Sequence, residues 1–446
     1  ATSLGSSLVG SMYILDEPSI GLHSKDSESL ISVLKDLRDL GNTVIVVEHD
    51  KAIMEAADYI IDIGPEAGNF GGQVVAKGDY KSLLKQKTLT AEYLNGKRYI
   101  KIPKQRRSSV SSIKIKGARA NNLKNINVEF PLNMLTAVTG VSGSGKSTLV
   151  KDILYPALQK KLMGYGPKPA EFSEISGNYS DLKFIEFVDQ NPIGRSSRSN
   201  PVTYIKAYDD IRALFSKQKL SVLRNYQPKH FSFNVDGGRC PTCKGEGIVT
   251  IEMQFMADVK LKCESCQGKR FKDSILEIKF NGKNIDDLLN MTINQALTFF
   301  DGHRCQKIKK KLQPLQDVGL GYVTLGQSSS TLSGGEAQRI KLASFLGKGN
   351  QSELGLFIFD EPSTGLHFHD IKKLLKSLNA LIDQGHSIIV IEHNLELIKS
   401  ADYIIDLGPE GGNNGGELMA FGTPENVAKS TNSLSAKYLE SALKDR

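Results

Sequence analysis

A glycine-rich stretch at residues 140–147 constrains the fold of this chain more than any other feature. It reads Gly-Val-Ser-Gly-Ser-Gly-Lys-Ser and fits the phosphate-loop pattern G-x-x-x-x-G-K-[ST]. An apolar, β-branched run at 135–139 precedes it and a helix-compatible run at 148–158 follows it, as the pattern requires. The sequence therefore predicts an α/β module whose buried parallel strand ends in a phosphate-binding loop.

The residue types in this loop suit phosphate binding. Glycines allow the backbone to turn so that successive N–H groups point at phosphate oxygens, and the helix N-terminus adds positive charge. Lys146 is expected to reach the β and γ phosphates, and the Ser147 hydroxyl to ligate Mg²⁺. The expected binding residues of the loop are Gly140, Ser142, Gly143, Ser144, Gly145, Lys146, Ser147 and Thr148.

The chain also contains an internal repeat with a fixed offset of 344 positions. Residues 12–18 (Met-Tyr-Ile-Leu-Asp-Glu-Pro) match residues 356–362 (Leu-Phe-Ile-Phe-Asp-Glu-Pro). The same offset maps Glu48-His49 onto Glu392-His393, and residues 57–66 onto 401–410, without a gap. Agreement of this length indicates a duplicated module.

The two copies are unequal. Only the second has a phosphate loop, and only the second has the segment Leu-Ser-Gly-Gly-Glu, with Ser333, Gly334, Gly335 and Glu336 as expected nucleotide-binding residues. The first residues of the chain resemble residues 343–346 of the second copy. We therefore expect a fragment of a longer protein, whose missing part holds the phosphate loop of the first module.

Two carboxylates close the acidic strand of each copy: Asp16 and Glu17 in the first, Asp360 and Glu361 in the second. Asp360 is expected at the depth of the phosphate loop, where a carboxylate holds Mg²⁺ through water. Glu361 is placed to polarise the attacking water. Phosphoryl transfer needs this division between charge neutralisation and orientation of the nucleophile.

Two further side chains follow predicted strands. His393 comes after the strand 387–391, and we expect it to sense or stabilise the γ-phosphate, because it is repeated as His49. Gln190 follows the strand 184–188 and is expected to ligate the metal. A lone histidine after a strand is more often structural. The repetition of His393 as His49 nevertheless favours a functional role.

The cysteines predict a structural metal site. Cys240-x-x-Cys243 and Cys263-x-x-Cys266 are separated by nineteen residues, which is the spacing of a four-thiolate zinc site. Four thiolates leave no open coordination position, so the metal would stabilise the fold without taking part in catalysis. The alternatives are free thiols or a redox pair. Cys305 stands alone and is interpreted as an ordinary thiol.

Length and charge set broader limits. A chain of 446 residues exceeds a single typical core, so two or three domains are expected. The net charge of +8 fits a polyanionic partner such as nucleic acid, but an excess of this size also occurs in proteins without one. No apolar run is long enough to span a bilayer, and a cytosolic protein is expected.

The expected organisation has four parts. Residues 1–96 form the C-terminal part of a first module, and 97–112 form a basic linker, for which a solvated tether is favoured over a nucleic-acid contact. Residues 113–158 and 323–446 form the second module, with a parallel sheet core and a small antiparallel sheet beside the nucleotide. Residues 159–322 form an inserted α+β domain that carries the cysteines.

Basic residues cluster around the cysteine pairs, with aromatic residues between them. Such a surface suits contact with a phosphate backbone without reading base edges, although a plain solvated face is as common for each residue taken singly. The candidate DNA contacts are Arg195, Arg198, Lys269 and Arg270.

Taken together, the phosphate loop, Gln190, Leu-Ser-Gly-Gly-Glu, Asp-Glu-Pro and the histidine His393 resemble the ATP-binding cassette ATPases. The chain resembles the UvrA family still more closely, over nearly its whole length. The segments that carry this resemblance are 189–195 (Asp-Gln-Asn-Pro-Ile-Gly-Arg), 198–201, 231–234, 237–240, 317–322 and 404–412.

This resemblance implies ATP-dependent recognition of damaged double-stranded DNA in nucleotide excision repair and the SOS response, with loading of UvrB and no incision. It implies ATP, Mg²⁺ and Zn²⁺ as ligands and a homodimer in the full-length protein. Each nucleotide site is shared between modules, so Ser333 to Glu336 would serve a site with Asp16, Glu17 and His49. We therefore expect this chain to bind nucleotide and zinc but to hydrolyse ATP poorly.

Three alternatives remain at this point. A UvrA-like paralogue that serves drug tolerance would share every motif named above. The ATPase module of a transporter is a second possibility, which the cysteine-bearing insertion and the lack of a membrane-facing apolar segment oppose. A zinc scaffold without enzymatic activity is the third, and it predicts no affinity for nucleotide.

Overall fold

The structure is a computed structural model that describes residues 9–65, 68, 71–194, 196, 198–253, 258–302, 305–347 and 353–444. It divides into two compact units, the first formed by residues 1–189 and 350–446 and the second by residues 190–349. Unit 1 contains both copies of the repeat, which we call the first module (residues 9–96) and the second module (residues 112–189 and 353–444). Glu66, Arg195, Phe255 and the first four residues lie outside the described residues.

The second module is built on a six-stranded sheet with the order β15-β14-β7-β13-β12-β9. All neighbouring strands run parallel except β15, which pairs antiparallel with β14. The strands are β7 (Leu135–Gly140), β9 (Phe184–Val188), β12 (Gly355–Asp360), β13 (Ser387–Ile391), β14 (Tyr403–Gly408) and β15 (Glu417–Gly422). The central strands β7 and β13 are buried along their whole length, as continuous apolar runs predict.

Strand register brings the predicted site residues to one edge of this sheet. Asp360, the last residue of β12, pairs with Ile391, the last residue of β13. The phosphate loop follows β7, which lies between β13 and β14. Because these strands are parallel, their carboxyl ends share one edge, so the loop, Glu361 and His393 come together there.

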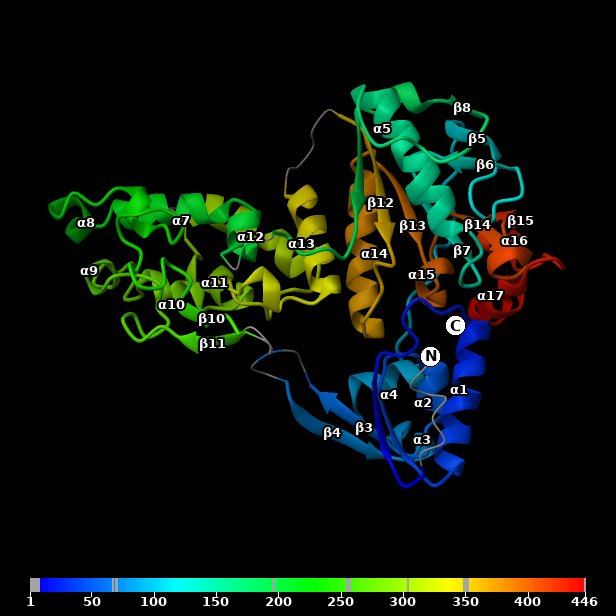
Figure 1. Cartoon of the computed structure of the whole chain (residues 1–446), viewed down its shortest axis with the longest axis horizontal. Helices are drawn as coiled ribbons and strands as arrows, with labels where there is room; N and C mark the ends of the chain where they lie inside the picture. Colours follow the sequence, from blue (N-terminus) through cyan, green and yellow to red (C-terminus); the bar gives the residue numbers. More distant parts are fainter. Residues whose placement is uncertain are drawn as a thin grey trace. The chain divides into compact units, whose positions relative to one another are not determined.

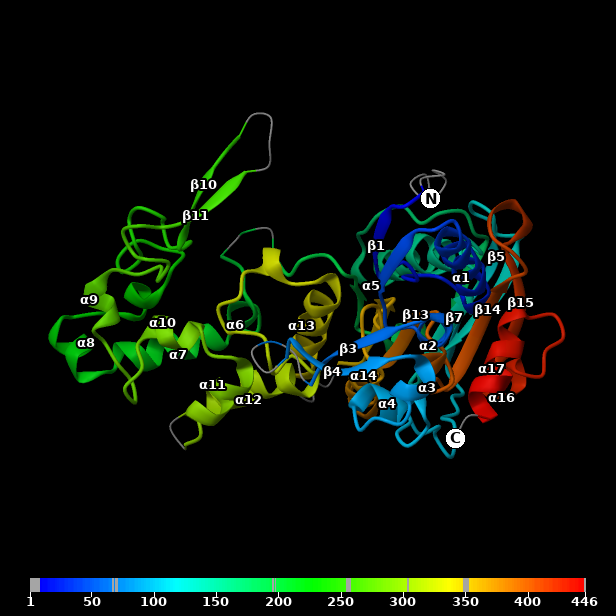
Figure 2. The ribbon, with the colours of Figure 1, turned by 90° about the horizontal axis from the view of Figure 1, so that it is seen from below.

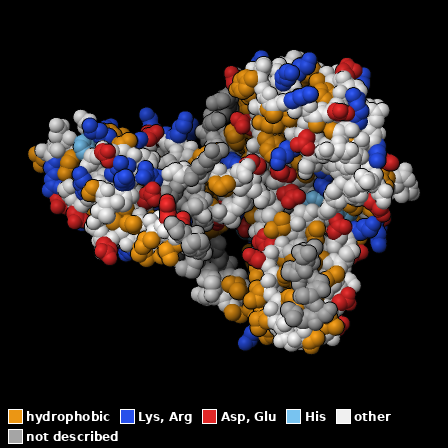
Figure 3. Space-filling model, viewed as in Figure 1, with side chains coloured by type: hydrophobic (Ala, Val, Ile, Leu, Met, Phe, Trp, Pro, Cys, Tyr) orange, Lys and Arg blue, Asp and Glu red, His pale blue; other side chains and the backbone are white. Residues whose placement is uncertain are grey.

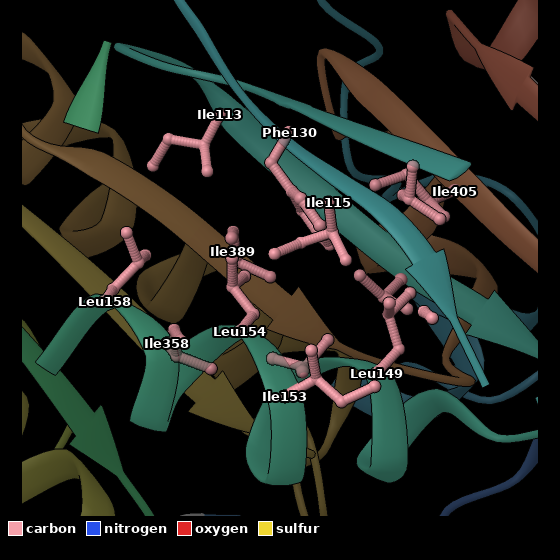
Figure 4. Packing of buried hydrophobic residues seen from close by; sticks show 14 of the residues in the cluster. Ile113, Ile115, Phe130, Leu149, Ile153, Leu154, Leu158, Ile358, Ile389 and Ile405 are labelled. Atoms are coloured by element: carbon pink, nitrogen blue, oxygen red, sulfur yellow. The ribbon is translucent and has the colours of Figure 1, made fainter. Parts of the chain in front are cut away.

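One face of the sheet packs against a second layer. The antiparallel strands β5 (Ser112–Ala118), β6 (Ile126–Pro131) and β8 (Glu174–Gly177) form a three-stranded sheet in the order β6-β5-β8. Ile113, Ile115 and Phe130 of this sheet meet Ile358 and Ile389 of the parallel sheet, as Figure 4 shows. Side chains of the segment after the phosphate loop complete the cluster, including Leu149, Ile153, Leu154 and Leu158.

The helix predicted over 148–158 begins differently from the expectation. Its first part is a π-helix, η2 (Thr148–Leu154), and α5 (Tyr155–Met163) continues it. Helix α14 (Phe368–Asp383) packs against β13 and β7 (Figure 1). The remaining helices of this module are α15 (Leu395–Ile398), α16 (Pro424–Val427) and α17 (Leu434–Lys444).

The first module repeats part of this architecture. Strands β1 (Met12–Asp16) and β2 (Thr43–Val47) pair in parallel, and β3 (Ile60–Gly64) and β4 (Gln73–Gly78) pair antiparallel. They form two separate two-stranded sheets, and among the described residues no strand joins β2 to β3 as β7 joins β13 to β14. The helices are α1 (Ser24–Asp39), α2 (Lys51–Ala56), α3 (Tyr80–Leu83) and α4 (Leu89–Leu94). Hydrophobic side chains reach the surface of this module in Figure 3, at the lower right.

The linker between the modules is not a solvated tether along its whole length, which corrects that interpretation. Arg106 donates to Ala401 O at 2.8 Å and to Glu425 Oε1 at 2.7 Å. Arg107 forms ion pairs with Asp402 and Asp383, both at 3.1 Å. These contacts fix the end of the linker on the second module.

Unit 2 is mainly helical. Its helices are α6 (Pro201–Tyr204), α7 (Ala207–Ser216), α8 (Lys219–Leu223), α9 (Asp273–Leu276), α10 (Ile285–Leu289), α11 (Ile293–Phe299), α12 (Gln306–Asp317) and α13 (Gly334–Leu346). Strands β10 (Ile248–Ile251) and β11 (Val259–Lys262) form a hairpin that extends away from these helices (Figure 2). In the described part of the chain, no helix has the length and apolar character needed to cross a membrane.

The boundaries of unit 2 differ from the expected insertion at 159–322. Residues 159–189 remain in unit 1 because β8 pairs with β5 and β9 pairs with β12. At the other end, α13 stays in unit 2 because it packs against α12 and α6. The predicted nucleotide-binding segment at 333–336 therefore belongs to unit 2.

Candidate nucleotide site and metal centre

The phosphate loop has the backbone that its glycines predict. Gly140, Gly143 and Gly145 have φ values of 132°, 74° and 103°, a region that side chains with a Cβ rarely adopt. A Cβ on Gly140 would lie 2.0 Å from Leu407 O, and one on Gly145 would lie 2.7 Å from Leu123 Cδ2. Gly140 is therefore required by conformation and by space, and Gly145 by its backbone conformation.

Lys146 is held inside the loop. Its Nζ donates to Gly140 O at 3.0 Å and to Val141 O at 2.9 Å. Burial lowers the pKa of Lys146 to about 8, although nearby carboxylates, with Glu361 first among them, act in the opposite direction. The Ser144 hydroxyl is buried and has no hydrogen-bond partner among the described residues. A buried ammonium group and an unpartnered hydroxyl beside exposed backbone turns fit a polyphosphate.

The two carboxylates at the end of β12 have different environments. Burial raises the pKa of Asp360, and the charge of Glu361 adds to the rise. The hydrogen bond with His393 lowers the pKa of Glu361, and His393 Nε2 lies 3.5 Å from Glu361 Oε1. Glu361 is thus ionised at neutral pH and oriented by His393, as a residue that polarises water requires. The first module repeats the pair, with 3.6 Å between His49 Nε2 and Glu17 Oε1.

A third glutamate of the site was not singled out from the sequence. Glu392 is fully buried and accepts three backbone N–H groups, from Ser363 at 2.8 Å, His393 at 2.7 Å and Asn394 at 2.9 Å. It joins the loop after Glu361 to the loop that carries His393. Glu48 makes the same contacts with Ser19, His49 and Asp50 in the first module. Its repetition beside each histidine was the available clue.

The two modules meet at the phosphate loop. Ser142 Oγ donates to Gly21 O at 3.1 Å, and Ser142 N donates to Asp26 Oδ2 at 3.4 Å. A Cβ on Gly21 would lie 3.2 Å from Glu361 Oε1, and one on Gly365 would lie 3.1 Å from Glu17 Oε1. The loop after each acidic strand therefore approaches the acidic pair of the other module.

The segment at 333–336 forms the capped start of α13 in unit 2. Ser333 N donates to Glu336 Oε2 at 2.9 Å, and Glu336 N donates to Ser333 Oγ at 3.2 Å. Tyr322 donates to Glu336 Oε1 at 2.6 Å, which fixes this carboxylate further. A Cβ on Gly334 would lie 3.0 Å from Gln190 Cβ, so Gln190 lies beside this helix start. The helix N-terminus at Gly334 and Gly335 suits an anion.

The four paired cysteines come together in unit 2. Cys240, Cys243, Cys263 and Cys266 are buried, and their sulfur atoms all lie within 4.8 Å of one another. Cys240 Sγ lies 4.0 Å from Cys263 Sγ, and Cys243 Sγ lies 3.6 Å from Cys266 Sγ. Sulfurs at the corners of a tetrahedral zinc site with the usual Zn–S bond lie about 3.8 Å apart. Gly247 N also donates to Cys243 Sγ at 3.2 Å, as a thiolate ligand favours.

The candidate DNA contacts differ from one another. Lys269 is exposed and accessible to a ligand. Arg198 forms an ion pair with Glu246 at 3.3 Å. The Arg270 side chain makes contacts within the protein: it donates to Gly326 O at 3.0 Å and lies over the Phe233 ring. The structure therefore argues against Arg270 as a surface contact.

Comparison with known proteins gives a consistent result. No family model matches the chain. UvrABC system protein A of Staphylococcus epidermidis is 54% identical over 445 residues, which is 99% of this chain and 47% of that protein. The Clostridium perfringens protein of the same name has the same identity and coverage. The chain spans about half the length of the curated relatives it matches.

A solved structure extends this similarity to the fold. The crystal structure of UvrA2 from Deinococcus radiodurans aligns with a TM-score of 0.92 and 41% identity, over 99% of this chain and 53% of that one. The phosphate loop, the duplicated acidic strands and the four-cysteine cluster all occur within the matched length. This chain therefore belongs to the UvrA family.

Proposed function

We propose that this chain is the nucleotide-binding part of an ATPase that recognises damaged DNA in nucleotide excision repair. One observation carries the proposal. The buried ammonium group of Lys146 donates hydrogen bonds to backbone carbonyls of a phosphate loop, and Glu361 and His393 lie at the same sheet edge. The relatives of this chain are named UvrABC system protein A, which supports repair over drug tolerance or transport.

The residues of the site divide the work of ATP hydrolysis. Lys146 and the backbone N–H groups of the loop hold the phosphates, while Ser147 would supply an oxygen ligand for Mg²⁺ and Asp360 would hold the ion through water. Mg²⁺, when bound, neutralises charge on the phosphate oxygens. Glu361 orients the attacking water and takes its proton, and its lowered pKa keeps it ionised for that role. His393 holds Glu361 in place.

We infer that a second site is assembled from the first module. Asp16, Glu17 and His49 repeat Asp360, Glu361 and His393 of the second module. Apolar side chains of β1, β2 and β3 are exposed, and among the described residues no phosphate loop lies beside these strands. This chain alone is therefore expected to bind ATP and hydrolyse it slowly.

The cysteine cluster is proposed to hold Zn²⁺ as a structural ion. Double-stranded DNA, UvrB and a second copy of the protein are proposed partners, on the ground of family membership. Lys269 and the exposed Lys260 and Lys262 of the β10–β11 hairpin are the basic side chains on which a contact with the DNA backbone would depend. A binding constant for duplex DNA that falls steeply with salt would agree with this proposal.

A fluorescent ATP titration tests the proposed function. We expect the chain to bind the analogue with Mg²⁺, and Lys146→Ala to weaken binding about 10- to 100-fold through loss of charged hydrogen bonds. Lys77→Ala, on the exposed part of β4, is the matched control and should leave binding unchanged. Equal affinity of wild type and Lys146→Ala would contradict the proposal.

A further inference from the structure

Two histidines lie at matching positions of the two modules, and each reaches across to the other module. His23 precedes α1, and His367 precedes α14. His23 Nε2 lies 3.1 Å from Ser435 Oγ on α17, and His367 Nε2 lies 3.3 Å from Thr90 Oγ1 on α4. Each contact joins the loop after one acidic strand to the last helix of the other module.

Both hydroxyl groups lead on to a carboxylate. Ser435 Oγ donates to Asp406 Oδ1 at 2.8 Å, and Thr90 Oγ1 donates to Asp62 Oδ1 at 3.0 Å. Asp406 and Asp62 are equivalent residues of β14 and β3, separated by the offset of the repeat. The structure thus contains two histidine–hydroxyl–aspartate relays of hydrogen bonds, which run in opposite directions between the modules.

The direction of the hydrogen bonds follows from the helix caps. His23 Nδ1 accepts from Lys25 N at 3.3 Å, and His367 Nδ1 accepts from His369 N at 3.2 Å. A neutral imidazole that accepts at Nδ1 carries its proton on Nε2. Burial lowers the pKa of His23 to about 4 and also lowers the pKa of His367, so both rings are neutral at pH 7. Each Nε2–H therefore donates to the hydroxyl, which donates to the aspartate.

The sequence around the two hydroxyls is also repeated. Residues 89–94 read Leu-Thr-Ala-Glu-Tyr-Leu and residues 434–439 read Leu-Ser-Ala-Lys-Tyr-Leu, one position beyond the offset of 344. The tyrosine of each copy packs edge-on against the histidine, with ring centroids 5.8 Å apart for Tyr93 and His367 and 5.7 Å apart for Tyr438 and His23. The same contact is thus built twice, with different neighbours in each module.

The aspartates at the ends of the two relays, Asp406 and Asp62, have different surroundings. Asp406 is buried, accepts a second hydrogen bond from Ser433 at 2.6 Å, and lies close enough to Lys146 for the two charges to favour each other. Its strand β14 pairs with β7, so that Leu407 lies opposite Gly140 at the start of the phosphate loop. Asp62 has no phosphate loop beside it in the described residues of the first module.

We propose that His23 is a positioning residue for the phosphate loop of the second module, acting through Ser435 and Asp406. His367 makes the equivalent contact to Asp62, beside which the described residues include no phosphate loop. The nucleotide site of one module is therefore set in part by a side chain of the other. This inference rests on the proposed function only for its nucleotide readout.

The first test needs no nucleotide. Amide hydrogen exchange at residues 140–147 is measured on the whole chain for wild type, His23→Ala and the matched variant His367→Ala. We expect exchange in the loop to be about tenfold faster in His23→Ala, as loss of one buried hydrogen bond implies, and unchanged in His367→Ala. Equal effects of the two variants, or no effect of His23→Ala, would overturn the proposal.

Three readouts separate positioning from a general loss of stability. His23→Gln, whose side-chain amide can donate to Ser435, should restore slow exchange in the loop. Ser435→Ala should shift the Nε2 resonance of His23 in ¹⁵N spectra and leave that of His367 unchanged. Affinity for a fluorescent ATP analogue should fall about tenfold in His23→Ala and stay constant in His367→Ala. If wild type binds no nucleotide, the proposed function fails, and the exchange experiment still decides the role of His23.

Discussion

The two modules of unit 1 share a sequence pattern but bury it to different extents. Ile358 and Ile405 of the second module are 0% exposed, whereas their equivalents Ile14 and Ile61 are 68% and 59% exposed. The strand pairings are the same, since Asp16 lies opposite Val47 as Asp360 lies opposite Ile391. The difference lies in residues 112–163, which supply β7, the β5–β6 layer and η2 to the second module alone. Burial of a strand is thus decided by its covering segment and not by its own sequence.

Removal of the same catalytic group from each module gives the largest expected contrast. Glu361→Gln should lower ATP turnover about 10²- to 10⁴-fold, because the amide cannot take the proton of the attacking water. Glu17→Gln should leave turnover within about threefold, since the described part of the first module has no phosphate loop beside Glu17. Steady-state phosphate release measures both. Equal losses in the two variants would mean that the modules act as equivalents.

Truncation of one apolar side chain in each module measures the difference in burial. Ile358→Ala should lower the free energy of unfolding by about 2–5 kcal/mol, as expected for a cavity in a packed core. Ile14→Ala should cost less than about 1 kcal/mol, because its side chain is already in solvent. Urea unfolding of both variants provides the numbers. A large loss in Ile14→Ala would show that the face of β1 is covered in solution.

The buried glutamates allow a comparison of smaller effect. Glu392→Gln should cost about 1–3 kcal/mol, because the NH₂ group of glutamine cannot accept and leaves at least one backbone N–H at this buried side chain without an acceptor. Glu48→Gln should cost under about 1 kcal/mol, since Glu48 is itself half-buried, unlike Glu392, and water can reach the groups that lose their acceptor. Thermal unfolding followed by circular dichroism would rank the two. A cost at Glu48 equal to that at Glu392 would contradict the difference in burial.

The smallest effect concerns the charge on Lys146, which has no counterpart in the described first module. Its pKa of about 8 in the free protein means that nucleotide binding takes up a proton once the pH exceeds that value. Affinity should therefore be constant below about pH 8 and fall by up to tenfold per pH unit above it. Lys146→Arg, which stays charged, should bind without this dependence. A flat profile in wild type would place the lysine pKa higher than its burial implies.

Much of the second module was predictable because short stretches of its sequence determine their own local structure. The strand–loop–helix around Lys146, the acidic strand ending at Asp360 and the spacing of Cys240 to Cys266 each carry their geometry within a short stretch of sequence. The contacts of Ser435, Arg106 and Arg107 were not predictable, because their partners lie hundreds of positions away or in another layer. The start of unit 2 at residue 190 differs from the expected residue 159 for the same reason, because β8 and β9 pair with distant strands of unit 1.

The anchored arginines also limit how far the modules can separate. Only eleven residues lie between the end of α4 at Leu94 and Arg106. A chain of that length spans at most about 40 Å when fully extended. If the crossed histidine contacts break, the first module is still present at an effective concentration in the millimolar range, so it rebinds as an intramolecular partner. Separation of the two modules is therefore reversible, because the linker keeps them close together. Cleavage of the chain before Arg106 would make their association depend on protein concentration.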